Sequence, residues 1–332
     1  MRSFFLLYWL CSWVTAAPFS VVVVGGGPAG LAAAIEAHQA GAYAVIVEKR
    51  SQYTRSQIIL LYKDALDLLE KWEVEVPEMT LYQLSHPLGI VEICHLENAL
   101  AKRALNLGIA KLFGTFKDFS AQGCVVDMDG ASDLHLPFDL LVGADGMHST
   151  VRNQLGISTT NLGYASGTIA LLHVSAIPYY KMQTQKRGDL YVRKVWLPPH
   201  TALILAQSPT CRNLTQENLG AIAQSSSWDA EAAVLKDQRA TFISGIPIAL
   251  QKANAFSDSE RKTILIGDAA AAASFFQWMG LPTALKTAEL AGKCVRDLVA
   301  GDEAYHQFNA NMEILTESLI DDSRYLFDTE AP

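Results

Sequence analysis

The chain has 332 residues, of which half are hydrophobic and 18% are charged. It is therefore long enough to bury a large core and too apolar to be a disordered chain. Its formal net charge of -8, together with the lack of a basic stripe, argues against a nucleic-acid-binding surface. The five cysteines show no Cys-x-x-Cys pair and no metal-ligand spacing, so we expect small buried residues and no metal site.

The first 17 residues have the layout of a secretory signal peptide. A positive charge at Arg2 precedes an apolar run over residues 4–14, and small residues follow at Ala16 and Ala17. The run is short for a membrane span, which normally needs about 20 residues. We therefore predict that residues 1–17 direct export to a secreted, periplasmic or lumenal location. A cytoplasmic chain with a hydrophobic extension and a membrane-anchored chain are the alternatives.

A buried strand and a glycine-rich turn come next. Valines 21–24 predict a strand that is apolar on both faces, as in a parallel sheet. In the Gly-x-Gly-x-x-Gly sequence that follows, Gly25 suits the tight turn and Gly27 lets backbone approach a pyrophosphate, while Gly30 lets the next helix pack closely. A turn without a ligand and an NAD site are the alternatives at this point.

The segment after the turn completes a nucleotide-binding pattern. A helix that begins near Pro28 and Ala29 would point its free N–H groups and positive end at phosphates. Residues 43–47 predict the next strand. That strand ends in Glu48, about 20 residues beyond the motif, where an acidic residue binds ribose hydroxyls. Strand, turn, helix, strand and terminal acid together predict a dinucleotide-binding unit.

The remaining elements predict an α/β fold with a parallel sheet and an inserted, mostly antiparallel sheet. Apolar spacing predicts helices over residues 56–70, 92–107 and 282–299. Strand-like runs lie at residues 110–113, 124–128, 134–137, 139–142 and 262–266. From about residue 163 to 247, strands separated by prolines are typical of an antiparallel sheet. The parallel sheet would thus use both ends of the chain, and C-terminal helices would complete it.

Two further motifs carry a family resemblance. Residues 143–152 read Gly-Ala-Asp-Gly-Met-His-Ser-Thr-Val-Arg, and residues 267–270 read Gly-Asp-Ala-Ala. With the glycine turn, they resemble the ordered motifs of the FAD-dependent aromatic hydroxylases, the group A flavoprotein monooxygenases with the p-hydroxybenzoate hydroxylase fold. Residues 48–56 also resemble the monooxygenase domain of the MICAL proteins. The resemblance covers nearly the whole chain after residue 19.

The resemblance implies a domain plan and a set of site residues. Residues 18–160 and 261–332 would form the Rossmann-like FAD-binding part with C-terminal helices, and residues 161–260 the inserted substrate sheet. In the family, the Asp at the position of Asp268 contacts the ribityl chain, and an arginine at the position of Arg55 lies close to the flavin. The predicted cofactor-binding residues are Gly25, Gly27, Pro28, Ala29, Gly30, Glu48, Lys49, Arg50, Arg55, Asp145, Gly267, Asp268, Gly280 and Leu281.

The resemblance also implies a reaction. NAD(P)H would reduce FAD, molecular oxygen would form a C4a-(hydro)peroxyflavin, and a small organic or aromatic substrate would be hydroxylated. No side chain is identified as a catalytic acid or base, because in this family the flavin carries most of the chemistry. Protein partners are unknown from the sequence.

Departures from the family pattern leave other functions open. Ala271 stands at the usual histidine, Ser274 and Phe275 stand at the usual proline, and Pro282 stands at the usual asparagine, although Gly280 and Leu281 are kept. His95 also stands where the family usually has an arginine. The alternatives are a flavin reductase or dehydrogenase that does not activate oxygen, and an exported FAD-binding protein without catalysis.

Three of the site residues have alternative structural roles. Asp145 is a residue type that favours turns, and Asp268 could cap the helix that follows it. Arg55 could be a solvated charge in a loop.

Overall fold

The computed structural model describes residues 19–128, 132–175, 180–197, 200–211, 214–301 and 303–327. The predicted signal peptide, residues 1–17, lies outside the described residues, so export stays a prediction. In the part of the chain that is described, no helix is long and apolar enough to cross a membrane.

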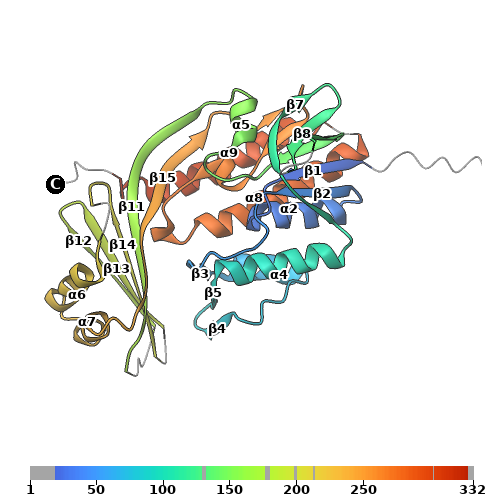
Figure 1. Ribbon diagram of the computed structural model, residues 1–332. Helices are drawn as coiled ribbons and strands as arrows, with labels where there is room; N and C mark the ends of the chain where they lie inside the picture. The colour runs from blue at the N-terminus through green and yellow to red at the C-terminus, as the bar shows by residue number, and fades with distance from the viewer. Residues whose placement is uncertain are drawn as a thin grey trace, which may run out of the picture.

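A mainly parallel sheet forms one half of the molecule (Figure 1). Its strand order is β16–β17–β10–β1–β2–β6, with only β16 antiparallel to its neighbour. The strands are β1 (Ser20–Val24), β2 (Tyr43–Glu48), β6 (Ala110–Phe113), β10 (Leu140–Gly143), β16 (Ser257–Asp258) and β17 (Thr263–Leu265). The sheet therefore joins segments that are more than 200 residues apart in sequence into one unit.

Helices cover one side of this sheet and a small antiparallel sheet covers the other, as Figure 1 shows. The helices of this half are α2 (Pro28–Gln39), α3 (Lys63–Lys71), α4 (Ile93–Asn106), α8 (Gly280–Ala300) and α9 (Tyr305–Arg324), and the short α5 (Thr150–Gln154) packs against β7 of the small sheet. The small sheet contains β7 (Thr115–Ser120), β8 (Gly123–Asp127) and β9 (Leu134–Leu136). Residues 29–37 of α2 are all buried, because α2 packs against β1, β2, α4 and α8. This complete burial explains its alanine-rich sequence.

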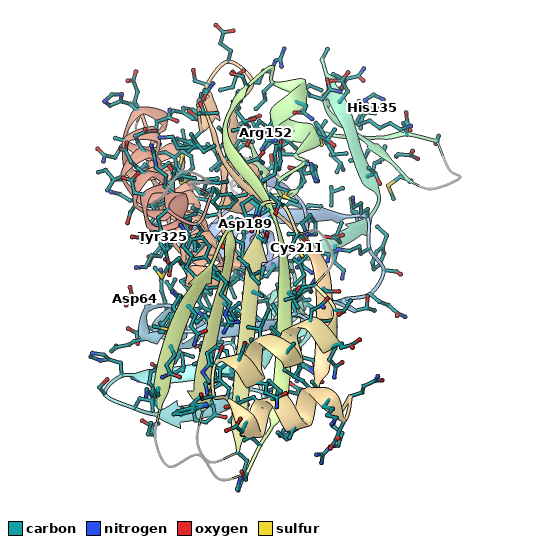
Figure 2. All side chains as sticks on the ribbon, turned by 90° about the vertical axis from the view of Figure 1, so that its left-hand side faces the viewer. Asp64, His135, Arg152, Asp189, Cys211 and Tyr325 are labelled. Carbon is teal, nitrogen blue, oxygen red and sulfur yellow. The ribbon has the colours of Figure 1, made fainter. Side chains whose placement is uncertain are left out.

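The second half is an antiparallel sheet in the order β12–β13–β14–β11–β15–β18. Its strands are β11 (Thr159–His173), β12 (Lys181–Arg187), β13 (Leu190–Leu197), β14 (Thr201–Ser208), β15 (Thr241–Ala253) and β18 (Ala271–Ala272). Helices α6 (Gln216–Ser225) and α7 (Asp229–Lys236) lie across its outer face, in front of the strands in Figure 2. Side chains alternate along β11, so Ala170 packs toward these helices and Ile169 packs into the cluster on the inner face.

A third, three-stranded sheet corrects one expectation. Its order is β3–β5–β4, formed by β3 (Ile58–Leu61), β4 (Thr80–Gln83) and β5 (Pro87–Glu92). The helix predicted over residues 56–70 is therefore wrong in its first half, and only α3 is helical. A run of four apolar residues, Ile58 to Leu61, fits either element by periodicity. Because the segment pairs antiparallel with β5, it forms a strand and not a helix.

The predicted fold class is confirmed: a parallel sheet is completed by the C-terminal segment and carries a mostly antiparallel inserted sheet. The antiparallel sheet spans residues 159–253 with β18 added later in the chain, and Ser257 and Asp258 already belong to the parallel sheet. Two short 3₁₀ helices, η1 (Gly267–Ala269) and η2 (Phe275–Gln277), lie between β17 and α8.

A buried carboxylate fixes the packing of α2 on α8. Glu36 is fully buried and accepts hydrogen bonds from Lys71 Nζ at 2.5 Å and Trp72 Nε1 at 2.7 Å. Arg296 Nη1 lies 3.3 Å from its other oxygen. A Cβ atom added at Gly292 would lie 2.5 Å from the Glu36 side chain. Glycine at position 292 therefore gives the buried carboxylate its space.

We predict that Gly292→Ala lowers the free energy of unfolding by about 1–3 kcal/mol, because it forces a paired and buried Glu36 to move. Gly220→Ala is the matched control: it is also in a helix, but its new Cβ would lie 3.5 Å from Leu235, an ordinary contact. Alanine there should be neutral or stabilise by up to about 1 kcal/mol. Chemical denaturation of both variants measures the difference, and equal effects would contradict the packing argument.

Candidate active site

Two of the predicted motifs are in backbone contact. Gly25 has a φ of +104°, and a Cβ atom there would lie 2.4 Å from the carbonyl oxygen of Ala144. A Cβ atom at Gly30 would lie 1.9 Å from the carbonyl oxygen of Gly25. Only glycine fits either position. The turn between β1 and α2 therefore lies directly against the turn that follows β10.

The third motif joins the same edge of the parallel sheet. Strands β1, β10 and β17 are adjacent and parallel, so the motifs after them meet at their carboxyl ends, where open α/β sheets bind ligands. Gly267 has a φ of +55°, and a Cβ atom there would lie 2.9 Å from the Ala29 Cβ atom. The three motifs, far apart in sequence, thus surround one place in the fold.

A cavity of about 690 Å³ opens at this place. Most of the residues predicted to bind the cofactor line it: Gly25, Gly27, Pro28, Ala29, Glu48, Lys49, Arg50, Arg55, Asp145, Asp268, Gly280 and Leu281. Gly30 and Gly267 are the exceptions, and each instead allows a close contact behind the wall. Their assignment as binding residues stays a prediction.

Glu48, at the end of β2, is buried and already hydrogen-bonded. Its Oε2 accepts from Gly26 N at 2.6 Å, and its Oε1 accepts from Arg50 N at 2.8 Å and Arg50 Nε at 3.0 Å. Burial works to raise the pKa of Glu48, but the Arg50 hydrogen bonds and charge outweigh it and lower the pKa overall. Glu48 is therefore an ionised acceptor held in one orientation.

Glu97 is a site residue that the sequence analysis missed. It is fully buried on α4, and its Oε1 is 3.3 Å from Arg50 Nη2 and also accepts a short hydrogen bond from Arg55 Nη2. Its Oε2 is buried without a partner in the described part of the chain. The sequence did contain a signal for Glu97: a charged residue beside Leu96 and Leu100, on the face of a predicted helix that is expected to be buried.

Asp268 lies in η1, on the other side of Arg55. The side chain of Asp268 faces the open space of the cavity. Protein atoms surround that space, and this burial raises the pKa of Asp268. The positive charge of Arg55 opposes that shift. Glu48, Arg50, Arg55 and Asp268 therefore line the cavity, and the buried Glu97 pairs with both arginines from behind the lining.

Asp145 has a structural role in addition to lining the cavity. Its carboxylate accepts hydrogen bonds from Ser149 Oγ at 2.5 Å, Thr150 N at 2.7 Å and Val151 N at 3.2 Å. These contacts satisfy free N–H groups at the start of α5. Its side-chain oxygens are thus engaged within the protein, and its assignment as a cofactor-binding residue stays a prediction.

Arg152, the last residue of the second motif, ties that motif to the third. Its guanidinium donates to the carbonyl oxygens of Ala269 at 2.8 Å and Met147 at 2.9 Å, and Figure 2 shows it near the top of the molecule, where the antiparallel sheet meets the rest of the fold. Gln251 Nε2, from β15, also donates to Met147 O at 2.8 Å. Arg152 therefore stabilises the cavity wall from behind, a role the sequence motif did not identify.

The segment that departs from the family pattern is firmly held. Ala271 is buried and pairs with Lys252 of β15. Ser274 Oγ donates to Gln207 and accepts from Phe276 N at 3.0 Å. Helix α8 then begins at Gly280, so its N-terminus, like that of α2, lies at the cavity wall. Two helix N-termini give this wall a positive potential suited to anions.

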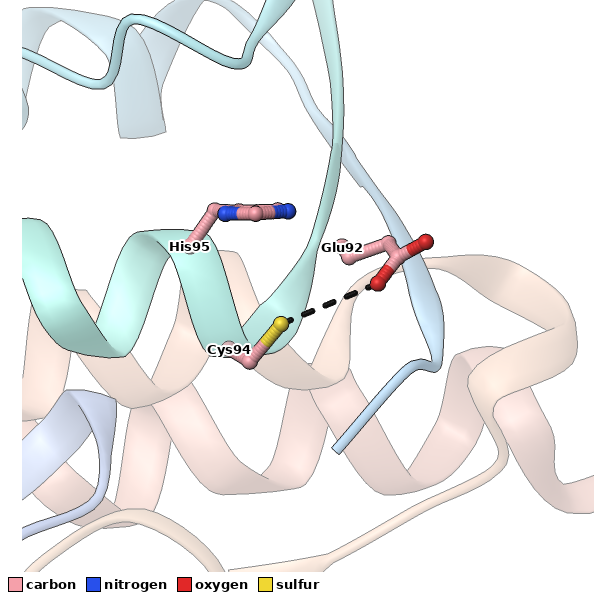
Figure 3. A group of neighbouring side chains, drawn as sticks. All are labelled: Glu92, Cys94 and His95. Atoms are coloured by element: carbon pink, nitrogen blue, oxygen red, sulfur yellow. Dashed lines mark hydrogen bonds between the residues drawn. The ribbon is translucent and has the colours of Figure 1, made fainter. Parts of the chain in front are cut away.

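A group of possible metal ligands lies next to this site. Ligand atoms of Glu92, Cys94 and His95 lie within 4.8 Å of one another (Figure 3). Burial, followed by the charge of Glu92, raises the pKa of the Cys94 thiol, whereas metal ligation needs a thiolate. The group also lies at the positive N-terminal end of α4, which disfavours a cation. Its three atoms are therefore poorly suited to hold a metal.

We predict that Asp268→Asn makes the cofactor-free protein more stable at neutral pH. Because burial raises the folded-state pKa of Asp268, folding favours the protonated carboxyl, and this contribution is lost as pH rises through the raised pKa. The two proteins should unfold at nearly the same temperature below about pH 4, and the variant should gain stability relative to the wild type as the pH rises from there to neutral. Thermal unfolding across this range measures the difference. A difference that does not change with pH would contradict the assignment.

The comparisons with known proteins agree with this geometry. The profile of the FAD_binding_2 family, described as an FAD binding domain, matches residues 20–59. F-actin-monooxygenase Mical of Drosophila melanogaster is 29% identical over 158 residues, which are 42% of this chain and 3% of that protein. The 12-dehydrotetracycline 5-monooxygenase/anhydrotetracycline 6-monooxygenase of Streptomyces rimosus is 29% identical over 168 residues, which are 42% of this chain and 33% of that enzyme. The chain thus spans a third or less of these two relatives.

Solved structures share the fold over most of the chain. The flavin-dependent brominase Bmp2 matches with a TM-score of 0.71 and 15% identity, covering 89% of this chain and 83% of the brominase. The flavin-dependent monooxygenase PieE, solved with FAD and substrate, matches with a TM-score of 0.68 and 16% identity, covering 92% of this chain and 62% of PieE. The resemblance that the three motifs predict is therefore confirmed: residues 20–59 match an FAD binding domain, and the chain shares the fold of these flavin-dependent enzymes.

Proposed function

We propose that this chain is an FAD-dependent oxidoreductase, an NAD(P)H-dependent monooxygenase that hydroxylates a small organic molecule. The observation that carries the proposal is the meeting of three motifs, far apart in the sequence, around one cavity. The similarity to monooxygenases supports the reaction class. NAD(P)H as donor and oxygen as acceptor rest on the family resemblance.

The residues of the cavity fit FAD. The N–H groups of Gly25 and Gly26 bond to Val47 O and Glu48 Oε2, whereas a Cβ atom at Gly27, at the start of α2, would meet nothing within 4 Å. The diphosphate would lie here, against the N-terminus of α2. Glu48 would accept from the ribose hydroxyls, and Asp268 would contact the ribityl chain near the N-terminus of α8.

When bound, FAD would supply the redox chemistry, taking electrons from NAD(P)H and passing them to oxygen. The protein would bind, orient and shield it. The paired Glu48 carboxylate and the Arg50–Glu97–Arg55 contacts hold charged groups in place before FAD arrives, which reduces the entropy lost on binding. The enclosed Asp268 would hold a hydrogen bond away from competing water.

One observation favours the reductase alternative. After Asp268, the cavity wall is made by Ala272, Ala273, Phe275 and Trp278, none of which has an acid or base to move a proton. Ala271, at the usual histidine, is buried in β18. A flavin reductase that does not activate oxygen would need no proton-transfer group here.

We also propose that residues 1–17 direct export. The support is the charged start, the apolar run and the small residues at Ala16 and Ala17. Expression of the full chain in a secreting host, followed by N-terminal sequencing of the product, tests this. A product that keeps residues 1–17 inside the cell would contradict it.

We predict that the purified protein is yellow or becomes yellow with added FAD, that NADPH or NADH bleaches the flavin without oxygen, and that air restores its colour. Absorbance spectra measure each step. Bleaching that air reverses only slowly would favour the reductase alternative, and a colourless protein that does not take up FAD would contradict the proposal.

Gly27→Ala tests the predicted position of the FAD diphosphate, and Gly220→Ala is its matched control. The added methyl group meets no protein atom, so the variant should fold as the wild type does. It would nevertheless occupy the space predicted for the diphosphate, and the FAD dissociation constant should rise by about tenfold or more. Gly220→Ala should leave FAD binding unchanged.

We predict that Glu97→Ala weakens FAD binding by about tenfold or more, because Arg50 and Arg55 must then be ordered by the cofactor itself, at about 0.5–1.5 kcal/mol for each side chain. Quenching of flavin fluorescence measures the affinity. Glu92→Ala is the control, because Glu92 ends β5 directly before α4 and its carboxylate lies at the Cys94 thiol and not at the two arginines. Unchanged or tighter binding by Glu97→Ala would show that the buried carboxylate does not position the arginines.

A further inference from the structure

One end of the cavity is lined by apolar side chains of the hydrophobic core. Its wall is formed by six side chains from β3, β11, β15 and the η2 region: Ile58, Leu60, Ile169, Ile248, Phe275 and Trp278. All six belong to, or pack against, one apolar cluster between the antiparallel sheet and the three-stranded sheet. Behind this wall lie more apolar residues of the same cluster, such as Leu203 and Leu205, and not solvent.

The aromatic part of this wall is preformed. A Cβ atom at Gly167 would lie 2.1 Å from the Phe275 ring, so glycine gives that ring its place against β11. Arg193 Nη1 donates to Phe276 O at 2.6 Å, which anchors η2. Trp278 has a φ of +63°, a conformation that a bulky residue adopts only where its surroundings hold it. The wall therefore offers fixed apolar surfaces to a ligand.

The two arginines that line the cavity are already paired with carboxylates. Arg50 and Arg55 both pair with the buried Glu97, and Arg55 also faces Asp268. Arg193 lies outside the cavity lining, and its guanidinium bonds Phe276 O, Gln277 Oε1 at 3.1 Å and Thr184 Oγ1 at 3.0 Å. Among the described residues of the apolar wall, none carries a positive charge.

We infer that this end of the cavity binds an uncharged, apolar, ring-bearing substrate and rejects carboxylates. The inference rests on the proposed function, since it takes the apolar end as the substrate compartment beyond FAD. A carboxylate placed there would leave water for an apolar wall with no cation to pair with, which is strongly unfavourable. Asp268 at the border would repel it further when ionised.

The test compares two ligands with the same ring system, one neutral and one charged: methyl 6-hydroxy-2-naphthoate and 6-hydroxy-2-naphthoate, which differ in one ester methyl group and one negative charge. Binding to the FAD-loaded protein is read from the perturbation of the oxidised flavin spectrum, without NAD(P)H. We expect the neutral ester to bind at least about 100-fold more tightly than the carboxylate. Equal affinities, or tighter binding of the carboxylate, would overturn the inference.

A charge placed in the wall tests the cause. Ile246, on β15, lines the cavity and is half-buried, so Ile246→Arg should raise carboxylate affinity and reduce the ester-to-carboxylate ratio by about tenfold or more. Ile243→Arg is the matched control, because Ile243 is half-buried on the same strand but does not line the cavity. An equal change in both variants would overturn the local explanation. If Ile246→Arg does not fold, the wild-type comparison still decides.

The outcomes separate this inference from the proposed function. A protein that takes up FAD and is reduced by NAD(P)H, yet binds the carboxylate as well as the ester, keeps the function and loses the inference. A protein that binds no FAD loses the proposed function before either ligand is added. A protein that binds FAD and prefers the ester, but is not reduced by NAD(P)H, keeps the inferred selectivity and changes the electron donor.

Discussion

The close approach of two backbone turns is the constraint on which the site depends. Gly25 and Ala144 are in contact only because position 25 has no Cβ atom and a positive φ. That contact brings the turns after β1 and β10 together, and Gly267 brings the segment after β17 against the first turn of α2. The cavity, its charged side chains and both helix N-termini are arranged around these contacts.

The polar contacts around the cavity act mainly on one another. Asp145 caps α5, Arg152 holds the second motif to the third, and Glu97 pairs with two arginines. Few charged groups in the wall are left without a partner charge. A preformed set of this kind binds a cofactor with little rearrangement, and it leaves selectivity at the far end of the cavity to apolar shape.

Local patterns were enough to predict the three motifs of the site and the parallel strands that precede them. Four valines, spaced glycines and a terminal Glu48 determine neighbouring strands, a turn and a buried acid, so the parallel sheet and its three motifs could be predicted. The strand at Ile58 could not, because a four-residue apolar run fits a strand or a helix until its partner strand is known. Helices α6 and α7 were also missed, since they cover a sheet face that the sequence does not reveal.

Partners distant in sequence explain the remaining failures. Glu97 pairs with Arg50 and Arg55 because α4 packs beside the loop that carries both arginines. The role of Arg152 depends on its hydrogen bond to Ala269 O, 117 residues away. The apolar wall combines residues from β3, β11 and β15, which only the tertiary fold brings together. The spacing of residues along the sequence does not show which of these side chains come into contact.

The wall residues belong to the core as well as to the cavity, and this has a consequence for evolution. Ile58, Ile169 and Ile248 are each at most 5% exposed, so a smaller residue that enlarges the compartment also removes core packing, at about 0.5–1.5 kcal/mol even for a single methylene. New substrate ranges would therefore be reached more readily through half-buried positions such as Ile246, or after stabilising changes elsewhere. In this fold, the free energy of unfolding limits which substitutions can change substrate specificity, in addition to the chemistry of the reaction.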